Sequence, residues 1–429
     1  MKIFLDSVGC RLNQSEIESY ASKFRTAGHT LVQSPEDADI AVINTCTVTF
    51  AADSDSRGKI RKAARVGANQ IIVTGCWSTL NPEQAARLPG VTQIIKNHQK
   101  DHLVEQVLQI PTEFFDLEPL SREFIPGARF RTRAVIKVQD GCDNHCTFCV
   151  TTIARGGGKS RSPGEILADI KTVLRDEPDE NKAAKEIVLT GVHLGSWGKD
   201  LPDKKHLKTL IEMILAETDV PRLRLSSLEP WDLDGDFFKL WEDSRLCRHL
   251  HLPLQSGSKT VLRRMARNTT PEKYSDLVKA ARNACPDIAI TTDLIAGFPG
   301  ETEQEFEETV NFIRQISFSG GHVFTYSARP GTAAATMPDQ VPHALRKERN
   351  ASLRGILSET ESHYQRKFYN QTLPVLWESV TKMDAETWHL HGLTDNYLRV
   401  HVNANQDLWN QITPVRLSSK DQHGFTGTI

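Results

Sequence analysis

The chain has 429 residues, enough for about two to four domains, and its formal net charge of −2 excludes a strongly basic footprint over the whole protein. No run of about eighteen apolar residues occurs, and the first residues lack the apolar stretch of a secretory signal. The sequence therefore predicts a cytoplasmic protein that neither spans nor binds a membrane.

Segments of strand and helix character alternate through the first 110 residues. Strands are expected at residues 2–8, 39–44, 70–74 and 92–95, and helices at 17–27, 56–66, 84–88 and 101–108. Such alternation is typical of a parallel sheet with helices on both faces. We therefore assign residues 1–112 to an open parallel α/β domain.

A linker rich in Pro, Glu and Arg is expected at 111–133, and the alternation then resumes. Six further strands are expected, at 134–139, 186–190, 222–226, 249–252, 288–294 and 322–326. The helices expected between them cover 163–175, 206–217, 234–243, 258–284 with a break at Pro271, and 301–316. Six strand–helix units in about 200 residues predict a partial (β/α)6 barrel, which we assign to residues 128–358.

The last part of the chain changes from helical to strand-like. One charged helix is expected at 341–370, followed by short strands at 373–380, 387–391, 398–402 and 412–417. This pattern predicts a small antiparallel β-barrel at residues 362–429. The fold class expected for the whole chain is therefore α/β with an appended β-barrel.

Three closely spaced cysteines form the strongest local motif. Cys142, Cys146 and Cys149 make a Cys-x3-Cys-x2-Cys loop directly after an expected strand, where the active sites of barrels are built. Three thiolates can bind three irons of a [4Fe–4S] cluster and leave the fourth iron open for a small-molecule chelate. Zinc is the alternative, with His145 or a distant cysteine as the fourth ligand.

Three other cysteines are far apart in the sequence but occupy equivalent positions. Cys10, Cys46 and Cys76 each lie just past an expected parallel strand. Because the carboxyl ends of parallel strands meet at one edge of a sheet, the three thiols are expected to converge there. Taken singly, each would more often be a small buried core residue.

The loop around Cys142 resembles that of the radical S-adenosylmethionine (SAM) superfamily. With Gly9-Cys10, Asn44-Thr45-Cys46 and Gly75-Cys76 ahead of it, the pattern resembles the methylthiotransferase family over essentially the whole chain. That family combines an N-terminal methylthiotransferase domain, a radical SAM core and a C-terminal TRAM barrel. The resemblance implies two [4Fe–4S] clusters, one at each cysteine trio, and SAM as a cofactor.

The resemblance also implies which residues lie near SAM. They belong to the cysteine loop and to the segments at the ends of the barrel strands: Phe148, Gly191, Ser226, Gln255, Ser256, Asp293 and Phe298. In this family a radical derived from SAM removes a substrate hydrogen, and a methylthio group then takes its place.

Three branches of the family differ in substrate. Residues 255–258 resemble the two branches that act on tRNA, and the segments 224–230, 292–293 and 322–329 look most like the branch that acts on threonylcarbamoyladenosine. This resemblance implies methylthiolation of C2 of N6-threonylcarbamoyladenosine-37 in tRNA, forming 2-methylthio-N6-threonylcarbamoyladenosine. The alternatives are isopentenyladenosine in tRNA and an aspartate of a ribosomal protein. A non-catalytic Fe–S or zinc RNA-binding protein is the alternative of a different class.

The partners implied are a tRNA anticodon stem-loop, an electron donor such as flavodoxin or ferredoxin, and a sulfur donor. The terminal barrel is mildly acidic, with four Lys and Arg against six Asp and Glu over residues 370–429. We therefore expect the phosphate contacts from Arg155, Lys159 and Arg161 beside the cysteine loop and from the helix expected at 341–370.

The remaining candidates are assigned to packing or to solvent. Cys247 and Cys285 match no cluster position and are expected in the core. Arg263, Arg264 and Arg267 are expected on a solvated helix face, with the SAM carboxylate or RNA as the alternative partner.

Overall fold

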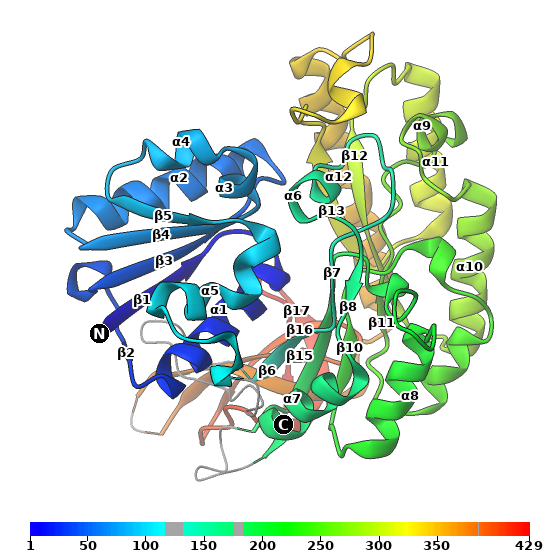
Figure 1. Ribbon diagram of the computed structural model, residues 1–429. Coiled ribbons are helices and arrows are strands. Elements are labelled where there is room, and N and C mark those ends of the chain that lie inside the picture. Colours follow the sequence, from blue (N-terminus) through cyan, green and yellow to red (C-terminus); the bar gives the residue numbers. More distant parts are fainter. Residues whose placement is uncertain (116–131, 176–182, 385) are drawn as a thin grey trace.

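The computed structural model describes residues 1–115, 132–175, 183–384 and 386–429. Figure 1 shows an N-terminal α/β unit beside a half-open barrel, with the terminal strands packed below both. The linker expected at 111–133 lies mostly outside the described residues. In the part that is described, no helix combines the length and the apolar character needed to cross a membrane.

The N-terminal unit is a five-stranded parallel sheet with the strand order β2-β1-β3-β4-β5. Its strands are β1 (Lys2–Ser7), β2 (Thr30–Leu31), β3 (Ile40–Thr45), β4 (Gln70–Gly75) and β5 (Val91–Ile95). Its helices are α1 (Arg11–Thr26), α2 (Phe50–Arg65), α3 (Cys76–Leu80), α4 (Pro82–Ala86) and α5 (Leu103–Leu108). One apolar cluster packs α1 and α5 on one face and another packs α2 on the opposite face, which confirms the predicted sheet covered on both sides.

The second unit has six parallel strands in the order β6-β9-β10-β11-β12-β13. They are β6 (Arg133–Lys137), β9 (Glu186–Thr190), β10 (Leu223–Leu225), β11 (His249–His251), β12 (Ala289–Ala296) and β13 (Gly320–Thr325). Between β10 and β11 the pairing is limited to two isolated bridges, Leu223 with Leu246 and Ser227 with His251. No pairing of β13 with β6 is found among the described residues. The expected partial barrel is therefore confirmed, and it is open between its first and last strands.

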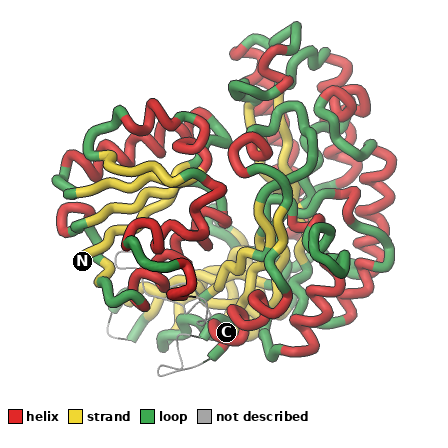
Figure 2. The backbone as a smooth tube through the Cα atoms, viewed as in Figure 1, coloured by secondary structure: helices red, strands yellow, loops and turns green. Residues whose placement is uncertain are grey.

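Helices cover the outside of this barrel (Figure 2). They are α7 (Pro163–Leu174), α8 (Leu207–Glu217), α9 (Lys259–Arg264), α10 (Pro271–Ala284), α11 (Glu303–Ile316) and α12 (His343–Arg366). The short helix α6 (Thr151–Arg155) instead faces the N-terminal unit, where it contacts α3 (Figure 1). Capping boxes start α7 at Ser162 and α11 at Thr302, and the Thr270 side chain caps α10 with Pro271 at its first turn. The break expected at Pro271 is therefore a helix start.

Short elements differ from the expectation. The helix expected at 234–243 is the shorter 3-10 helix η6 (Phe237–Glu242), and it buries Phe237, Phe238 and Leu240. The strand expected at 134–139 is divided into β6 and β7 (Gln139–Asp140), and β7 pairs with β8 (Lys159–Ser160). The other 3-10 helices are η1 (Pro35–Asp37), η2 (Asn97–His102), η3 (Thr112–Phe115), η4 (Leu194–Ser196), η5 (Pro230–Asp232) and η7 (Ala333–Thr336).

The C-terminal unit is a closed five-stranded barrel with the order β14-β15-β16-β18-β17. Its strands are β14 (Thr372–Lys382), β15 (Trp388–Thr394), β16 (Arg399–Ala404), β17 (Ile412–Lys420) and β18 (Phe425–Thr428). The small barrel is confirmed, but β18 was not expected, and it pairs in parallel with β16. Buried Trp377, Val400 and Phe425 form part of its core.

Two arginines of the half-open barrel attach the terminal barrel to it. Arg224 is fully buried, pairs with Glu186 at 2.6 Å and donates to the Asp395 carbonyl at 3.0 Å. Arg222 donates to the carbonyls of Leu393 and Pro374. Because both arginines satisfy backbone carbonyls of the terminal barrel, the position of that barrel depends on β10.

We predict that Glu186→Gln lowers the free energy of unfolding by about 3 kcal/mol, because it leaves the buried Arg224 charge without its partner. Denaturant unfolding at neutral pH measures the change. The matched control is Glu217→Gln at the exposed Lys171–Glu217 pair, which we expect to change the value by less than about 1 kcal/mol.

The same pair gives a pH dependence. Burial alone would raise the pKa of Glu186, but Arg224 holds it below its ordinary value of 4.5. Its stabilising contribution is therefore present above that value and lost as the pH falls further. The difference in the free energy of unfolding between wild type and Glu186→Gln should therefore become smaller in acid. A difference that stays constant down to about pH 2 would contradict the ion pair as its cause.

Candidate functional site

The first cysteine trio lies at the carboxyl ends of three adjacent strands. Cys10 follows β1 as the residue before α1, Cys46 follows β3, and Cys76 begins α3 directly after β4. Burial raises the pKa of Cys46 to about 11, and the neighbouring Cys10 and Cys76 thiols add to this rise. The fold therefore brings together three thiols that are separated by 35 and 29 residues in the sequence.

The glycines before two of these cysteines are required by their conformation and by space. Gly9 has a φ of 104° and Gly75 a φ of 97°, in the region that favours glycine. A Cβ at Gly9 would lie 2.5 Å from the Cys46 sulfur, and one at Gly75 would lie 2.2 Å from the Thr45 carbonyl oxygen. Side chains at either position would therefore disturb the cysteine trio itself.

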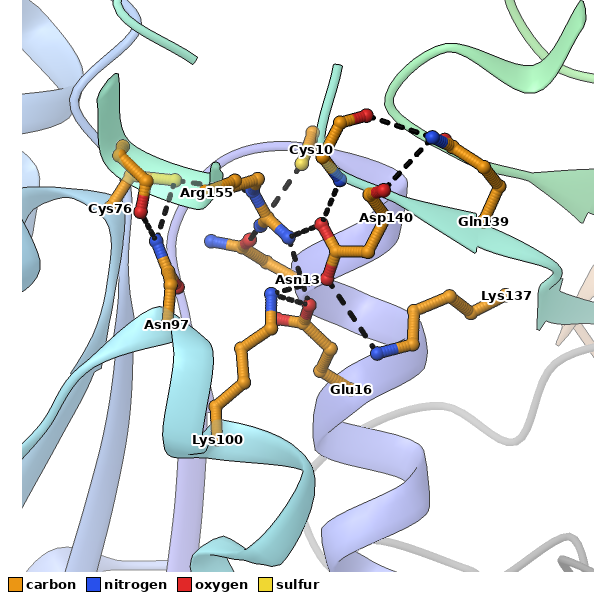
Figure 3. A network of polar contacts seen from close by, with 12 residues as sticks. Cys10, Asn13, Glu16, Cys76, Asn97, Lys100, Lys137, Gln139, Asp140 and Arg155 are labelled. Carbon is orange, nitrogen blue, oxygen red and sulfur yellow. Dashed lines mark hydrogen bonds and ion pairs between the residues drawn. The ribbon is translucent and has the colours of Figure 1, made fainter. Parts of the chain in front are cut away.

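Arg155 of α6 connects this trio to a buried ion-pair network (Figure 3). Its Nε donates to the Cys76 sulfur at 3.3 Å, and its Nη1 lies 2.9 Å from Asp140 and 3.1 Å from Glu16. Lys100 bridges the same two carboxylates at 2.7 and 2.5 Å. Glu16 and Lys100 belong to the N-terminal unit and Asp140 and Arg155 to the barrel, so the network joins the two units beside the sulfurs.

Two asparagines complete the surroundings of the sulfurs. Asn97 donates to the Cys76 sulfur at 3.6 Å and to the Ala154 carbonyl at 2.7 Å. Asn13 accepts from Arg155 at 2.6 Å and lies 3.7 Å from the Cys10 sulfur. Hydrogen bonds to the ligand sulfurs are one of the means by which a protein tunes an iron–sulfur cluster.

The three residues expected to contact phosphate have different surroundings. The donors of Arg155 are bound by Glu16, Asp140 and other groups of the chain, and its side chain is only 3% exposed, so this guanidinium is not available to a phosphate. Arg161 pairs with Asp169 at 2.8 Å. Lys159 is exposed on β8. The burial of Arg155 follows from its contacts across the two units, which the local sequence does not reveal.

The second cysteine trio lies in the loop between β7 and α6. The backbone amides of Asn144 and Thr151 point at the sulfurs of Cys142 and Cys149, both at 3.4 Å. Burial raises the pKa of Cys146 to about 11 although Arg267 lies nearby. Such backbone donors favour the negatively charged thiolate, which is the form of cysteine that binds iron.

Polar groups on other strands pack against this loop. Burial alone would lower the pKa of His193, but its contacts with Asp232 and Cys142 raise it to about 9. His193 Nε2 lies 2.5 Å from Asp232. Arg267 pairs with Glu229 at 2.5 Å and lies 3.7 Å from the Cys146 sulfur.

The position expected for Arg267 was wrong. The helix α9 ends at Arg264, and Arg267 lies beyond it with its side chain buried beside the cysteine loop. Arg264 instead pairs with Glu305 at 2.7 Å. Cys247 and Cys285 are buried, as expected.

A cavity of about 1040 Å³ connects the first cysteine trio with the open side of the barrel. Of the seven residues expected near SAM, Gly191, Ser226 and Asp293 line it. The Ser226 hydroxyl and one carboxylate oxygen of Asp293 are buried without a hydrogen-bond partner. Because buried polar atoms are normally paired, these two atoms fit a bound ligand that carries hydroxyl or amino groups.

The other four expected residues do not line this cavity. Phe298 is buried and stands edge-on to Phe148, with ring centroids 6.5 Å apart. The Ser256 hydroxyl pairs with Thr309 at 3.0 Å. Gln255 has a φ of 73° and bonds the backbone of β12.

Both cysteine trios fit iron–sulfur clusters. In the described part of the chain, no three His, Cys, Asp or Glu side chains converge closely enough to hold one metal ion. A cubane cluster does not need such convergence, because it binds each thiolate to a different iron. The residues that would hold the clusters are therefore Cys10, Cys46 and Cys76 for one and Cys142, Cys146 and Cys149 for the other.

Sequence reasoning missed the network that surrounds the first trio. Cys10, Asn13 and Glu16 are spaced by three residues, which places them on one face of α1 and is a signal that could have identified two of its members. Asn97, Lys100 and Asp140 carry no comparable signal.

Comparisons with known proteins show which family the chain resembles. Residues 136–313 match the radical SAM superfamily, and residues 2–96 match the uncharacterized protein family UPF0004. The chain is 36% identical to threonylcarbamoyladenosine tRNA methylthiotransferase MtaB of Bacillus subtilis (strain 168), over 96% of this chain and 92% of that protein. It is 31% identical to the tRNA-2-methylthio-N(6)-dimethylallyladenosine synthase of Bacillus pumilus (strain SAFR-032), over 100% of this chain and 86% of that protein.

Solved structures support the fold. The radical SAM methyltransferase TsrM from Kitasatospora setae superposes with a TM-score of 0.58 at 15% identity, covering 78% of this chain and 75% of that one. The cobalamin-dependent SAM radical enzyme OxsB gives a TM-score of 0.51 at 13% identity, covering 84% and 56%.

We predict that Arg155→Met lowers retention of the cluster at Cys10, Cys46 and Cys76, because Glu16 and Asp140 lose a cation and the Cys76 sulfur loses a donor. The test is made in a Cys142/Cys146/Cys149→Ala background, so that only this cluster is counted. Iron and sulfide after anaerobic reconstitution should fall clearly below about four per chain. Lys171→Met on the exposed face of α7 is the control, and equal iron contents in the two variants would refute the role of Arg155.

Proposed function

Since the chain belongs to the methylthiotransferase family of radical SAM enzymes, we propose that it methylthiolates C2 of N6-threonylcarbamoyladenosine-37 in tRNA. The relatives named for threonylcarbamoyladenosine share 34–36% identity with the chain. Those named for dimethylallyladenosine share 30–31% and also span nearly all of it, which makes that base the second candidate.

The protein is a transferase whose cofactors are SAM and two [4Fe–4S] clusters. When bound, SAM and a cluster at Cys142, Cys146 and Cys149 would supply the radical that removes a hydrogen, and Cys10, Cys46 and Cys76 would hold the cluster that carries the sulfur. The chain itself positions these groups: Ser226 and Asp293 present unpaired polar atoms, and the network around Arg155 fixes the first cysteine trio against the barrel.

The observation that carries the proposal is the shared cavity. It is lined by Cys10, Cys46 and Cys76 on one side and by Gly191, Ser226 and Asp293 on the other. A base bound in this cavity would lie between the first cysteine trio and the residues expected near SAM. Position 37 belongs to a single-stranded loop, so its base is exposed at a lower cost than a base within a duplex.

The remaining partners follow from the same chemistry. The reaction needs a one-electron donor such as flavodoxin or ferredoxin and a source of sulfur, and it takes place in the cytoplasm, where tRNA is found. The exposed Lys159 is a phosphate contact of the anticodon stem-loop in this proposal, with Arg161 beside it.

We expect the reconstituted enzyme to convert tRNA that carries N6-threonylcarbamoyladenosine to its 2-methylthio derivative, as measured by mass spectrometry of the nucleosides. Parallel reactions contain tRNA with dimethylallyladenosine, or ribosomal protein. Product on dimethylallyladenosine alone would assign the protein to the second candidate substrate, and product on ribosomal protein alone would exclude tRNA.

We predict that Cys46→Ala abolishes methylthiolation but still permits reductive cleavage of SAM, because the two cysteine trios are separate sites. 5′-Deoxyadenosine and methylthiolated nucleoside are measured in the same reaction. The control is Cys247→Ala, which removes a buried thiol outside both trios. Methylthiolated product from Cys46→Ala would remove the first trio from the mechanism.

A further inference from the structure

Arg11 is a basic side chain of the cavity wall that has no acidic partner within the described residues. Arg11 is the first residue of α1, follows Cys10 directly and lines the cavity. Its Nη2 donates to the Tyr397 hydroxyl at 2.8 Å. Within the described residues its other guanidinium N–H groups have no hydrogen-bond or ion-pair partner. An arginine has five such donors, so most of this side chain is available to a ligand.

The other basic side chains in this wall are differently placed. Arg155 is bound by Glu16 and Asp140, and Lys420 donates to Gln365. Arg399 is exposed on β16 of the terminal barrel. Arg11 is therefore a half-buried cation directly after Cys10, and most of its N–H donors have no partner within the described residues.

Tyr397 holds Arg11 in position. Its ring stacks on His249 with centroids 4.4 Å apart and planes 13° from parallel, and the Arg224 guanidinium lies 5.2 Å from its centroid. A tyrosine fixed on two sides offers a rigid acceptor, which orders the arginine before any ligand binds. The terminal barrel thus contributes to the cavity through a residue that acts on the N-terminal unit.

The chemistry of the substrate indicates what Arg11 binds. C2 and the N6 nitrogen flank N1 on the same edge of adenine, so a group attached to N6 lies near the carbon that must approach the cluster at Cys10. The threonylcarbamoyl group ends in a carboxylate, and the dimethylallyl group is apolar. A guanidinium matches a carboxylate in both charge and fork geometry.

We propose that Arg11 binds the carboxylate of the N6-threonylcarbamoyl substituent and so determines the preference for this base, with Tyr397 as the positioning residue. This inference rests on the proposed function. In this proposal a single side chain next to Cys10 distinguishes N6-threonylcarbamoyladenosine from dimethylallyladenosine.

The test compares two anticodon stem-loops, one with N6-threonylcarbamoyladenosine and one with its neutral methyl ester. Wild-type enzyme should bind the acid about 10- to 100-fold more tightly than the ester, as a charged hydrogen-bonded contact provides. Arg11→Gln should bring this ratio close to one, Arg11→Lys should retain part of it, and Tyr397→Phe should reduce it. Arg399→Gln is the matched control, and it should weaken both RNAs equally and leave the ratio unchanged.

Each remaining result contradicts the proposal. If Arg11→Gln weakens both RNAs equally, the side chain binds phosphate. If it lowers the iron content of the reconstituted protein, the side chain acts through the cluster. A wild type that modifies only dimethylallyladenosine would overturn the proposed function and this inference together, whereas an unchanged ratio in Arg11→Gln would overturn the inference alone.

Discussion

The buried ion pairs around Arg155 are the constraint on which the rest of the site depends. Glu16, Asp140, Lys100 and Arg155 come from both units and are nearly enclosed. A buried charge is tolerated only when it is paired, so each unit needs the other to satisfy its charges. Because Arg155 also reaches the Cys76 sulfur, the contact that joins the units places the first cysteine trio against the barrel.

The terminal barrel depends on a second set of arginines, of which Arg222 and Arg224 are buried and Arg248 is partly exposed. Arg222 and Arg224 satisfy its backbone carbonyls, and Arg248 pairs with Asp395 at 2.6 Å. These contacts bring Tyr397 to the cavity, where it meets Arg11. The terminal barrel is therefore part of the cavity wall through Tyr397, and its mildly acidic net charge does not reveal this contact with Arg11.

The cavity lies where the N-terminal sheet, the half-open barrel and the terminal barrel meet. The parallel sheet brings three separated cysteines to one edge, the half-open barrel leaves its interior accessible, and the terminal barrel covers part of the opening. Gly9 and Gly75 are required because a side chain at either position would meet the neighbouring strand end. Local backbone geometry and the packing of whole units thus act on the same few sulfurs.

The sequence alone predicted what is periodic or closely spaced. Alternating strands and helices indicated the two α/β units, and the short strands at the end indicated the barrel, because side-chain periodicity follows directly from local backbone geometry. The residues after β1, β3 and β4 identified the first cysteine trio, since parallel strands end at a common edge. The choice of family came from the cysteine motifs and their order.

Only the tertiary structure decided how the units complete each other. The sequence placed Arg155 with the phosphate contacts and Arg267 on a solvated helix face, and both are buried beside sulfurs in ion pairs to distant residues. It missed β18 and the contact of Arg11 with Tyr397, which are far apart along the chain. A charged side chain has no periodicity that reveals its partner, and its role is fixed only when the packing of the units determines which opposite charge it meets.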